Sequence, residues 1–403
     1  MSPELFRAQE KFANGMESPP GPTAFRFLRA EEEPWLSACF VPPPEFNRMA
    51  GPHSCVIFGE ARSGKTAIYR ELLARNVRPD GRPLCLVVRW QPSPLPLEAR
   101  PDLAWVRRLV EGTLDACASA LVHHLFRFPE DYDQAPCWVR NRLTWFIHRY
   151  TLGQPEFRWE PLAEGQEPGA ALIRHILGAP VPTILHDDAH PETVIAELLS
   201  ALRAMRLEGV WVMTDGLEGW AEVASDRLVE SLQAFLSTLS LFGPSGPVYK
   251  LFLPSEMEPA IGRAGGLARR RVEGIRIRWD SPTLQRLVEG RLAFAFGRET
   301  FPLEELCSAP TLREWLEKVG GTSPREWLDQ VAVLAEHYWA FPQSAPIDEE
   351  TWKKLRRQHP PRLYLEEEKT AGEGWGTSGE PGGFARKGLR YTPLPVPSQR
   401  SGR

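Results

Sequence analysis

The sequence predicts an α/β protein: a parallel sheet with surrounding helices, then an all-helical C-terminal domain and a disordered tail. Between about residues 54 and 280, short apolar segments alternate with segments of helical periodicity. Such alternation indicates a parallel sheet whose ligands bind at the carboxyl ends of the strands. After Asp280 only helical periodicity remains, and from about Glu366 glycine, proline, serine and charged residues replace the apolar ones. A segment of that composition cannot bury a core, so we expect it to be disordered.

The composition is that of an ordinary globular protein, with 42% hydrophobic and 25% charged residues in a chain of 403. The formal net charge of −4 gives no basic field, so nucleic-acid binding is possible but not indicated. Six scattered cysteines without a C-x-x-C pair favour reduced thiols in the cytoplasm. The segment Met1–Phe12 lacks the apolar core of a signal peptide, and no uncharged apolar run reaches the ~20 residues that cross a bilayer. We therefore expect a cytoplasmic protein without membrane contact.

The first half of the chain alternates strands and helices after a flexible arm at residues 1–23. Strands are predicted where short, β-branched apolar runs are bounded by glycine or proline, and helices where apolar residues recur at helical spacing. On these criteria strands lie at 54–58 and 83–90, and helices at about 65–75, 102–126 and 136–150. The last two helices belong to an insertion at about 102–180, and residues 151–185 receive no assignment.

The second half continues the alternation and then becomes helical. Pro191 opens a helix, since proline at the first turn loses no hydrogen bond. The predicted helices lie at about 191–207, 225–241, 283–296, 311–319, 323–338 and 349–357, and the predicted strands at 209–215, 248–253 and 274–279. This organisation gives a core at 24–280, a helical lid domain at 281–362 and a disordered tail at 363–403.

A glycine-rich loop joins the first strand to its helix and fits the pattern G-x-x-x-x-G-K-T of a P-loop. The residues of this loop are Gly59, Glu60, Ala61, Arg62, Ser63, Gly64, Lys65 and Thr66. The glycines allow backbone N–H groups to face a phosphate, and the following helix adds its positive end. Lys65 is placed to reach the β- and γ-phosphates, and the Thr66 hydroxyl to ligate Mg²⁺. A chance glycine-rich turn is the alternative, and the strand before and helix after the loop favour the nucleotide site.

An acidic residue follows the buried strand at 209–215 and is the second part that a P-loop requires. Asp215 comes directly after Val-Trp-Val-Met-Thr and is expected to complete the Mg²⁺ site with Thr66. Glu218, three residues on, is a candidate general base for orienting water. The alternatives are an ordinary turn at Asp215 and a surface glutamate at Glu218.

The P-loop, the sequence Asp-Gly-Leu-Glu from Asp215 to Glu218, a later apolar strand and a helical lid together resemble the AAA+ and STAND branch of P-loop ATPases. The resemblance extends over about residues 24–340. It implies an AAA+-like P-loop NTPase core, ATP and Mg²⁺ as ligands, slow hydrolysis of ATP to ADP and phosphate, and ATP-dependent homo-oligomers.

The resemblance also nominates two residues near the γ-phosphate. Ser255 follows the strand at 249–253, where such ATPases place a polar sensor; an ordinary strand-end turn is the alternative. Arg325 lies in the first turn of the lid helix, which Ser323 and Glu326 start as a capping box. The alternative for Arg325 is a solvated position, although a cation at a helix N-terminus opposes the helix dipole.

Further positions concern the base and the neighbouring subunit. Val41 precedes the P-loop where these ATPases pack adenine. Arg263 and Arg269–Arg271 resemble either an arginine finger or a contact to nucleic-acid phosphates, with a solvated charge run as the alternative.

The expected function is an ATP-dependent switch that controls self-association and a protein or nucleic-acid partner, with an unknown protein partner bound through the C-terminal tail. Two alternatives remain open. One is an ATP-gated adaptor or scaffold that does not hydrolyse ATP. The other is a DNA-associated ATPase of replication, transposition or defence.

Overall fold

The computed structural model describes residues 21–25, 30, 35–91, 103–151, 155–184, 189–215, 229–230, 232–238, 246–263, 272–342 and 346–359. These residues belong to one compact unit that ends at His359. The predicted tail at 363–403 and nearly all of the predicted arm at 1–23 lie outside the described residues. Among the described residues, no helix combines the length and apolar character needed to cross a bilayer.

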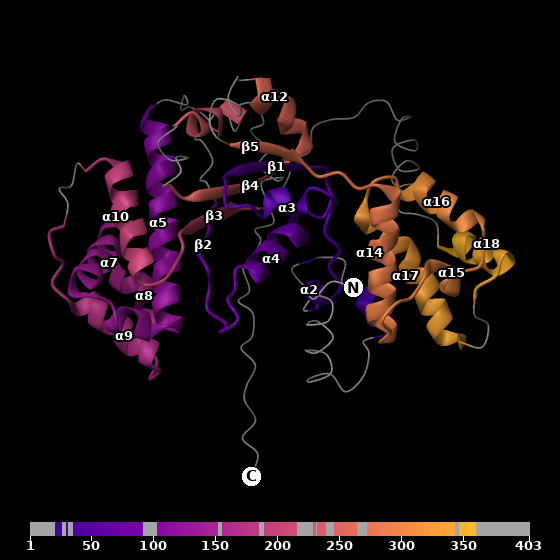
Figure 1. Cartoon of the computed structure of the whole chain (residues 1–403), viewed down its shortest axis with the longest axis horizontal. Coiled ribbons are helices and arrows are strands. Elements are labelled where there is room, and N and C mark those ends of the chain that lie inside the picture. Colours follow the sequence, from indigo (N-terminus) through magenta and orange to yellow (C-terminus); the bar gives the residue numbers. More distant parts are fainter. Residues whose placement is uncertain are drawn as a thin grey trace, which may run out of the picture. The chain divides into compact units, whose positions relative to one another are not determined.

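Five parallel strands form the sheet, which confirms the predicted α/β class (Figure 1). Their order is β2-β3-β4-β1-β5, so β4 and β5 flank β1. Three of the five strands, β1, β3 and β4, are almost wholly buried, as expected for the centre of a parallel sheet covered on both faces. The strands are β1 (Cys55–Gly59), β2 (Leu86–Arg89), β3 (Val210–Thr214), β4 (Val248–Pro254) and β5 (Glu273–Arg276).

The helices agree with most of the predicted segments, and the unassigned region 151–185 contains two more. In sequence order they are η1 (Gly21–Phe25), α2 (Leu36–Cys39), α3 (Phe46–Met49), α4 (Lys65–Arg75), α5 (Leu103–Arg127), α6 (Pro129–Asp133), α7 (Cys137–Tyr150), α8 (Pro155–Ala163), α9 (Pro168–Gly178), α10 (Pro191–Ala204), η4 (Ser255–Met257), α12 (Glu258–Arg263), α14 (Ser281–Phe296), α15 (Leu303–Leu306), α16 (Thr311–Gly320), α17 (Pro324–Ala340) and α18 (Glu349–Gln358). Of the helix predicted at 225–241, the described residues 229–230 and 232–236 are helical.

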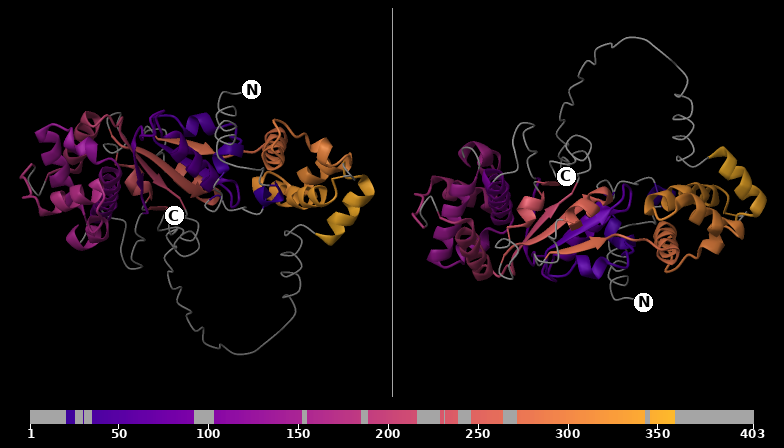
Figure 2. Two further views of the ribbon diagram at one scale, coloured as in Figure 1. Left: turned by 90° about the horizontal axis from the view of Figure 1, so that it is seen from below. Right: turned by 90° about the horizontal axis from the view of Figure 1, so that it is seen from above.

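Two hydrophobic cores lie on opposite faces of the sheet. Val56 and Phe58 of β1 pack in the core that includes α5, α7, α9 and α10. Cys55 and Ile57 pack in the other core, with residues of α4, α14, α16 and α17. This alternation along β1 follows from the two-residue period of a strand. The parallel strands that separate the two cores can be followed in both views of Figure 2. The second of these cores therefore joins the sheet to the C-terminal helices.

A fully buried lysine holds the segment before β1 in place. Lys250 of β4 is 0% exposed, and its ammonium donates to the carbonyl oxygens of Gly51 at 2.7 Å and His53 at 2.8 Å. Its backbone is paired in register with Cys55 at the start of β1. Burial lowers the pKa of Lys250, because the charged ammonium has lost water. The lysine therefore links β4 to the segment that leads into β1.

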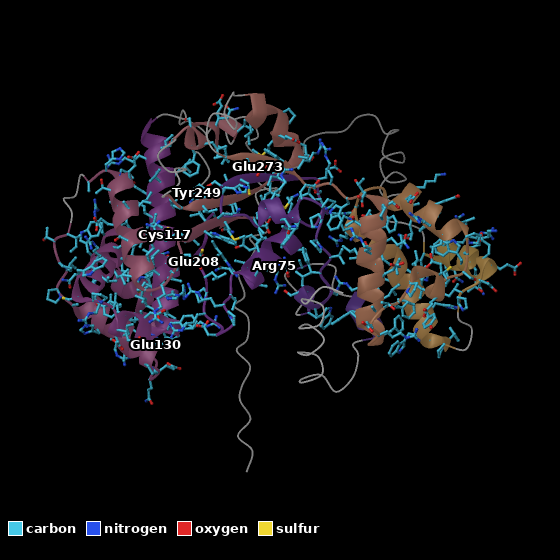
Figure 3. The ribbon with its side chains drawn as sticks, in the orientation of Figure 1. Arg75, Cys117, Glu130, Glu208, Tyr249 and Glu273 are labelled. Carbon is cyan, nitrogen blue, oxygen red and sulfur yellow. The ribbon has the colours of Figure 1, made fainter. Side chains whose placement is uncertain are left out.

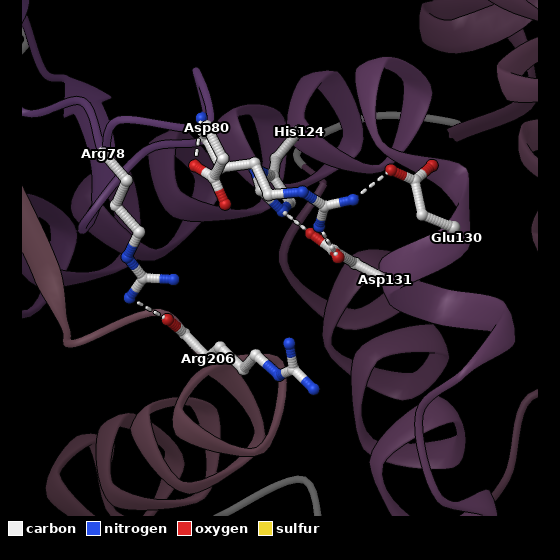
Figure 4. A network of polar contacts seen from close by, with 7 residues as sticks. Arg78, Asp80, His124, Glu130, Asp131 and Arg206 are labelled. Atoms are coloured by element: carbon white, nitrogen blue, oxygen red, sulfur yellow. Dashed lines mark hydrogen bonds and ion pairs between the residues drawn. The ribbon is translucent and has the colours of Figure 1, made fainter.

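A polar network joins the helical insertion to the edge of the sheet (Figure 4). Arg82, shortly before β2, forms ion pairs with Glu130 and Asp131 of α6. His124 at the end of α5 lies 2.9 Å from Asp131, measured from its Nε2 to a carboxylate oxygen. Burial raises the pKa of Asp131, but the hydrogen bonds from His124 and Arg82 outweigh it, so the pKa falls below its ordinary value. Asp131 is therefore an ionised anchor for the insertion.

Buried thiols predict a loss of stability at alkaline pH. Burial raises the thiol pKa from 9.0 to about 11 in Cys55, Cys85 and Cys307, and to about 12 in Cys117. Cys117 lines a small apolar cavity with Tyr249. Both residues are labelled in Figure 3. Because the unfolded chain releases these protons first, the stabilisation is complete below pH 9.0 and is lost as the pH rises towards about 11, by about 1.4 kcal/mol per thiol and pH unit.

The urea concentration at the midpoint of unfolding should therefore decrease when the pH is raised from about 8 to about 10. Lys250, whose pKa is lowered, acts in the opposite direction because its unfolded form binds more protons. Four thiols outweigh this single lysine. The substitution Cys117→Ala should reduce the slope of midpoint against pH, and an unchanged midpoint over this range would contradict the prediction.

Candidate nucleotide-binding site

The glycine loop (residues 59–66) follows β1 directly, and its two glycines are required by its geometry. Gly64 has a φ of +85°, in the left-handed region that side chains disfavour, and it is the N-cap of α4. At Gly59, a Cβ would lie 2.4 Å from Ser63 Oγ. A side chain at Gly59 would therefore displace the Ser63 side chain and crowd those of Ile277 and Lys65. The loop is closed tightly on itself, and it ends at the positive end of an eleven-residue helix.

Lys65 lies over the loop rather than in solvent. It is 5% exposed, and its ammonium donates to the carbonyl oxygens of Gly59 and Glu60, each at 2.8 Å. Both acceptors are neutral. An anionic phosphate oxygen is a stronger acceptor for an ammonium than a carbonyl is. The lysine is thus held where a phosphate in the loop could take over its hydrogen bonds.

The carboxyl ends of β1, β4 and β3 bring three predicted residues to one edge of the sheet. Gly59 is paired with Pro254, so Ser255 follows directly beside the start of the glycine loop. Asp215 follows Thr214, which is paired with Leu251 on the other side of β4. Because the strands are parallel, Ser255 and Asp215 lie at the same edge as the loop.

Two buried hydroxyl groups at this edge have no hydrogen bond within the described part of the chain. They are Ser63 Oγ in the loop and Thr214 Oγ1 at the end of β3. Buried polar atoms are nearly always paired, so such atoms indicate a site for water or a ligand. Ser63 belongs to the predicted phosphate loop, and Thr214 directly precedes Asp215, the predicted metal ligand.

The first turn of α17 contacts the glycine loop. Ser323 Oγ accepts a hydrogen bond from the backbone N–H of Glu326 at 3.4 Å, as the predicted cap requires. The other hydrogen bond of the predicted capping box, from the Ser323 N–H to the Glu326 carboxylate, does not form. The N–H of Ser323 donates instead to the carbonyl oxygen of Gly320. The Glu326 carboxylate instead accepts from the Arg62 guanidinium at 2.6 Å. Arg325, which precedes Glu326 in the sequence, is partly buried.

Two further contacts shape the site. Trp279, three residues beyond β5, is buried and donates from its indole N–H to the carbonyl oxygen of Ser63 at 2.9 Å. Val41 lies against α14, since a Cβ at Gly290 would be 3.4 Å from its side chain. The predicted adenine-side residue therefore contacts the first C-terminal helix. Neither Trp279 nor the contacts of Glu326 were predicted from the sequence.

The remaining predicted residues either make few contacts at the site or lie outside the described residues. Glu60 is exposed and forms an ion pair with Arg276 at 3.5 Å, while Ala61 is exposed and Thr66 partly buried. Glu218 and Arg269–Arg271 lie outside the described residues, and so does the side chain of Arg263 at the end of α12. Within the described ranges, no group of three or more His, Cys, Asp or Glu side chains could hold a metal ion.

The chain matches no protein-family model and no curated protein. Its function must be inferred from the residues and contacts of the site.

Proposed function

We propose that this chain is an AAA+/STAND-like P-loop ATPase that binds ATP with Mg²⁺ in the glycine loop. The observation that carries the proposal is the geometry of that loop. A left-handed Gly64, a close-packed Gly59 and a buried Lys65 precede the N-terminus of α4, at the carboxyl end of a strand flanked by β4 and β5. This is the arrangement in which backbone N–H groups and a lysine cradle phosphates.

The residues present suit a magnesium ion. The Thr66 hydroxyl and the Asp215 carboxylate supply the oxygen ligands that Mg²⁺ prefers, with water and phosphate oxygens as the others. The hydroxyls of Ser63 and Thr214, which have no hydrogen bond to any described residue, fit a hydrated ion and its phosphate at the same edge. When bound, the ion neutralises phosphate charge. Lys65 provides the second positive charge, and Ser255 and Arg325 are the residues that we propose for the terminal phosphate.

Hydrolysis tests the enzymatic part of this proposal. Glu218 is the proposed general base, and positioned bases contribute about 10²- to 10⁴-fold to rate. In a single-turnover assay with excess protein and Mg²⁺-ATP, Glu218→Gln should slow phosphate release by at least about 100-fold relative to wild type. Binding of ADP by both proteins is the control. Equal rates would remove Glu218 as the base and favour the ATP-gated adaptor that does not hydrolyse ATP.

The C-terminal helices α14 to α18 are proposed as a lid whose position, and with it self-association, depends on the nucleotide. The contact of Glu326 with Arg62 and that of Val41 with α14 support this role. Mass in solution should therefore differ between ADP and a non-hydrolysable ATP analogue. The same mass with both nucleotides would contradict the proposed switch.

A nucleic-acid partner is favoured by one observation in this region. Four exposed side chains in the second half of α18 are basic, whereas Glu349 and Glu350 make its first turn acidic, and its apolar residues Trp352 and Leu355 are buried. The basic residues are Lys353, Lys354, Arg356 and Arg357. Such side chains can contact phosphates, and each contact adds to the salt dependence of binding. DNA affinity that falls with salt would support this partner, whereas weak affinity that is insensitive to salt would leave a protein partner.

A further inference from the structure

We propose that the Arg62–Glu326 ion pair transmits phosphate occupancy of the glycine loop to α17, with Glu326 as the positioning residue for Arg325. This inference rests on the proposed nucleotide site. The pair joins Nη1 of Arg62 in the loop to a carboxylate oxygen of Glu326 in the first turn of α17, at 2.6 Å. It connects residues that are 264 positions apart in the sequence.

The backbone at Arg62 indicates that its side chain has a role. Arg62 has a φ of +65°, in the left-handed region where glycine is favoured. Arg62 and Arg206 are the two non-glycine residues with positive φ in the part of the chain that the structure describes. Strained backbone of this kind tends to persist where the side chain has a function. The guanidinium of Arg62 provides one, since it supplies the cation beside Glu326.

Burial makes the pair difficult to separate. The Glu326 side chain is 5% exposed, and that of Arg62 is 34% exposed. The second carboxylate oxygen of Glu326 is also buried and accepts no hydrogen bond from the described residues. A buried carboxylate that loses its cation is strongly disfavoured. Glu326 should therefore follow Arg62 when the loop moves, instead of releasing it.

Phosphate binding gives the loop a reason to move. Lys65 bonds the carbonyl oxygens of Gly59 and Glu60, and a phosphate that takes this ammonium removes both hydrogen bonds. We expect the loop backbone to rearrange once these two hydrogen bonds are lost. Through Arg62, the change reaches the first turn of α17, where Arg325 is adjacent to Glu326. A triphosphate extends further from the loop than a diphosphate, so α17 can distinguish the two by the reach of Arg325.

The test measures nucleotide preference and local protection together. Wild type, Glu326→Gln, Arg62→Gly and the double variant are titrated with Mg²⁺-ADP and a non-hydrolysable Mg²⁺-ATP analogue. Hydrogen exchange of residues 321–334 is followed with each nucleotide. Arg62→Gly suits the left-handed backbone, so its effect reports the lost guanidinium. Glu305→Gln, which removes the exposed Arg298–Glu305 pair at 2.8 Å among the same helices, is the matched control.

Glu326→Gln should lower the preference for the ATP analogue over ADP about tenfold, a typical coupling between sites. It should also lose the exchange protection that the analogue induces in wild type. Arg62→Gly should show the same loss, and the double variant no more than either single change, because the two residues act as a pair. Glu305→Gln should behave as wild type. Melting curves establish that each variant is folded. If Glu326→Gln is unfolded, Arg62→Gly alone tests the role of the ion pair.

The outcomes separate this inference from the proposed function. A wild-type chain that binds neither nucleotide overturns both. A wild type that binds both, with unchanged preference and protection in the folded variants, leaves the nucleotide site in place and overturns the role of Arg62 and Glu326.

Discussion

Replacing Lys65 with alanine is expected to lower the affinity for Mg²⁺-ATP by about 100-fold or more. Hydrogen bonds to charged groups contribute about 1.5–3 kcal/mol each, and about 2.7 kcal/mol corresponds to 100-fold in affinity. The 5% exposure of Lys65 increases the effect, because solvent screens a buried charge poorly. Isothermal titration with Mg²⁺-ATP and Mg²⁺-ADP measures the loss.

Two variants isolate the phosphate contact from the fold. Lys65→Ala also removes a donor from the Gly59 and Glu60 carbonyl oxygens, at a cost of about 1 kcal/mol each, so its melting temperature must be recorded without nucleotide. Lys318→Ala removes an exposed lysine of α16 and should bind nucleotide as wild type does. If Lys65→Ala keeps wild-type affinity while folded, the glycine loop does not bind the phosphates.

Replacing Trp327 with alanine should destabilise the protein by about 4 kcal/mol, within the range for large aromatic residues in cores. Trp327 is 0% exposed and lies among the C-terminal helices. Its indole N–H donates to the carbonyl oxygen of Gly321 at 3.3 Å, and a Cβ at Gly320 would lie 2.4 Å from its ring. The side chain therefore fills the joint between α16 and α17, and alanine leaves a cavity there.

The comparison for Trp327 comes from the same helix. Trp339 of α17 is 47% exposed, so Trp339→Ala removes the same side chain from a partly solvated position. Its cost should be about 1 kcal/mol, the centre of the distribution for point substitutions, because the half-exposed ring still packs on Phe296. Thermal melting followed by circular dichroism compares the two variants. Equal shifts in melting temperature would show that Trp327 does not hold the joint.

The sequence predicted the central strands and the glycine loop well because their signals are local. The segment 54–58 is almost β1, and the helix at 65–75 is α4. A short apolar run between turn residues can form little else than a buried strand when a glycine loop follows it. The strand expected at 274–279 ends at Arg276, because Trp279 turns to bond Ser63. That contact depends on the tertiary fold.

The helices missed between 151 and 185 illustrate a different limit. Prolines made this stretch resemble a loop, yet Pro155 and Pro168 begin α8 and α9. Proline is well suited to the first turn, where its missing N–H loses no bond. At the site, Glu326 was explained by a local cap, and its long-range partner Arg62 leaves no pattern in the sequence. Spacing can therefore nominate residues of one loop but not contacts between distant segments.

The position of β1 in the sheet also has a consequence for biosynthesis. Of its two neighbours, β4 begins 193 residues after the start of β1, and β5 begins 218 residues after it. At about 5–20 residues per second, β1 waits roughly 10–40 s on the ribosome before either neighbour emerges. During that time both edges of an apolar strand lack partners, a state prone to aggregation. A truncated chain ending before residue 248 would therefore lack a stable glycine loop, and nascent chains of that length should depend on chaperones.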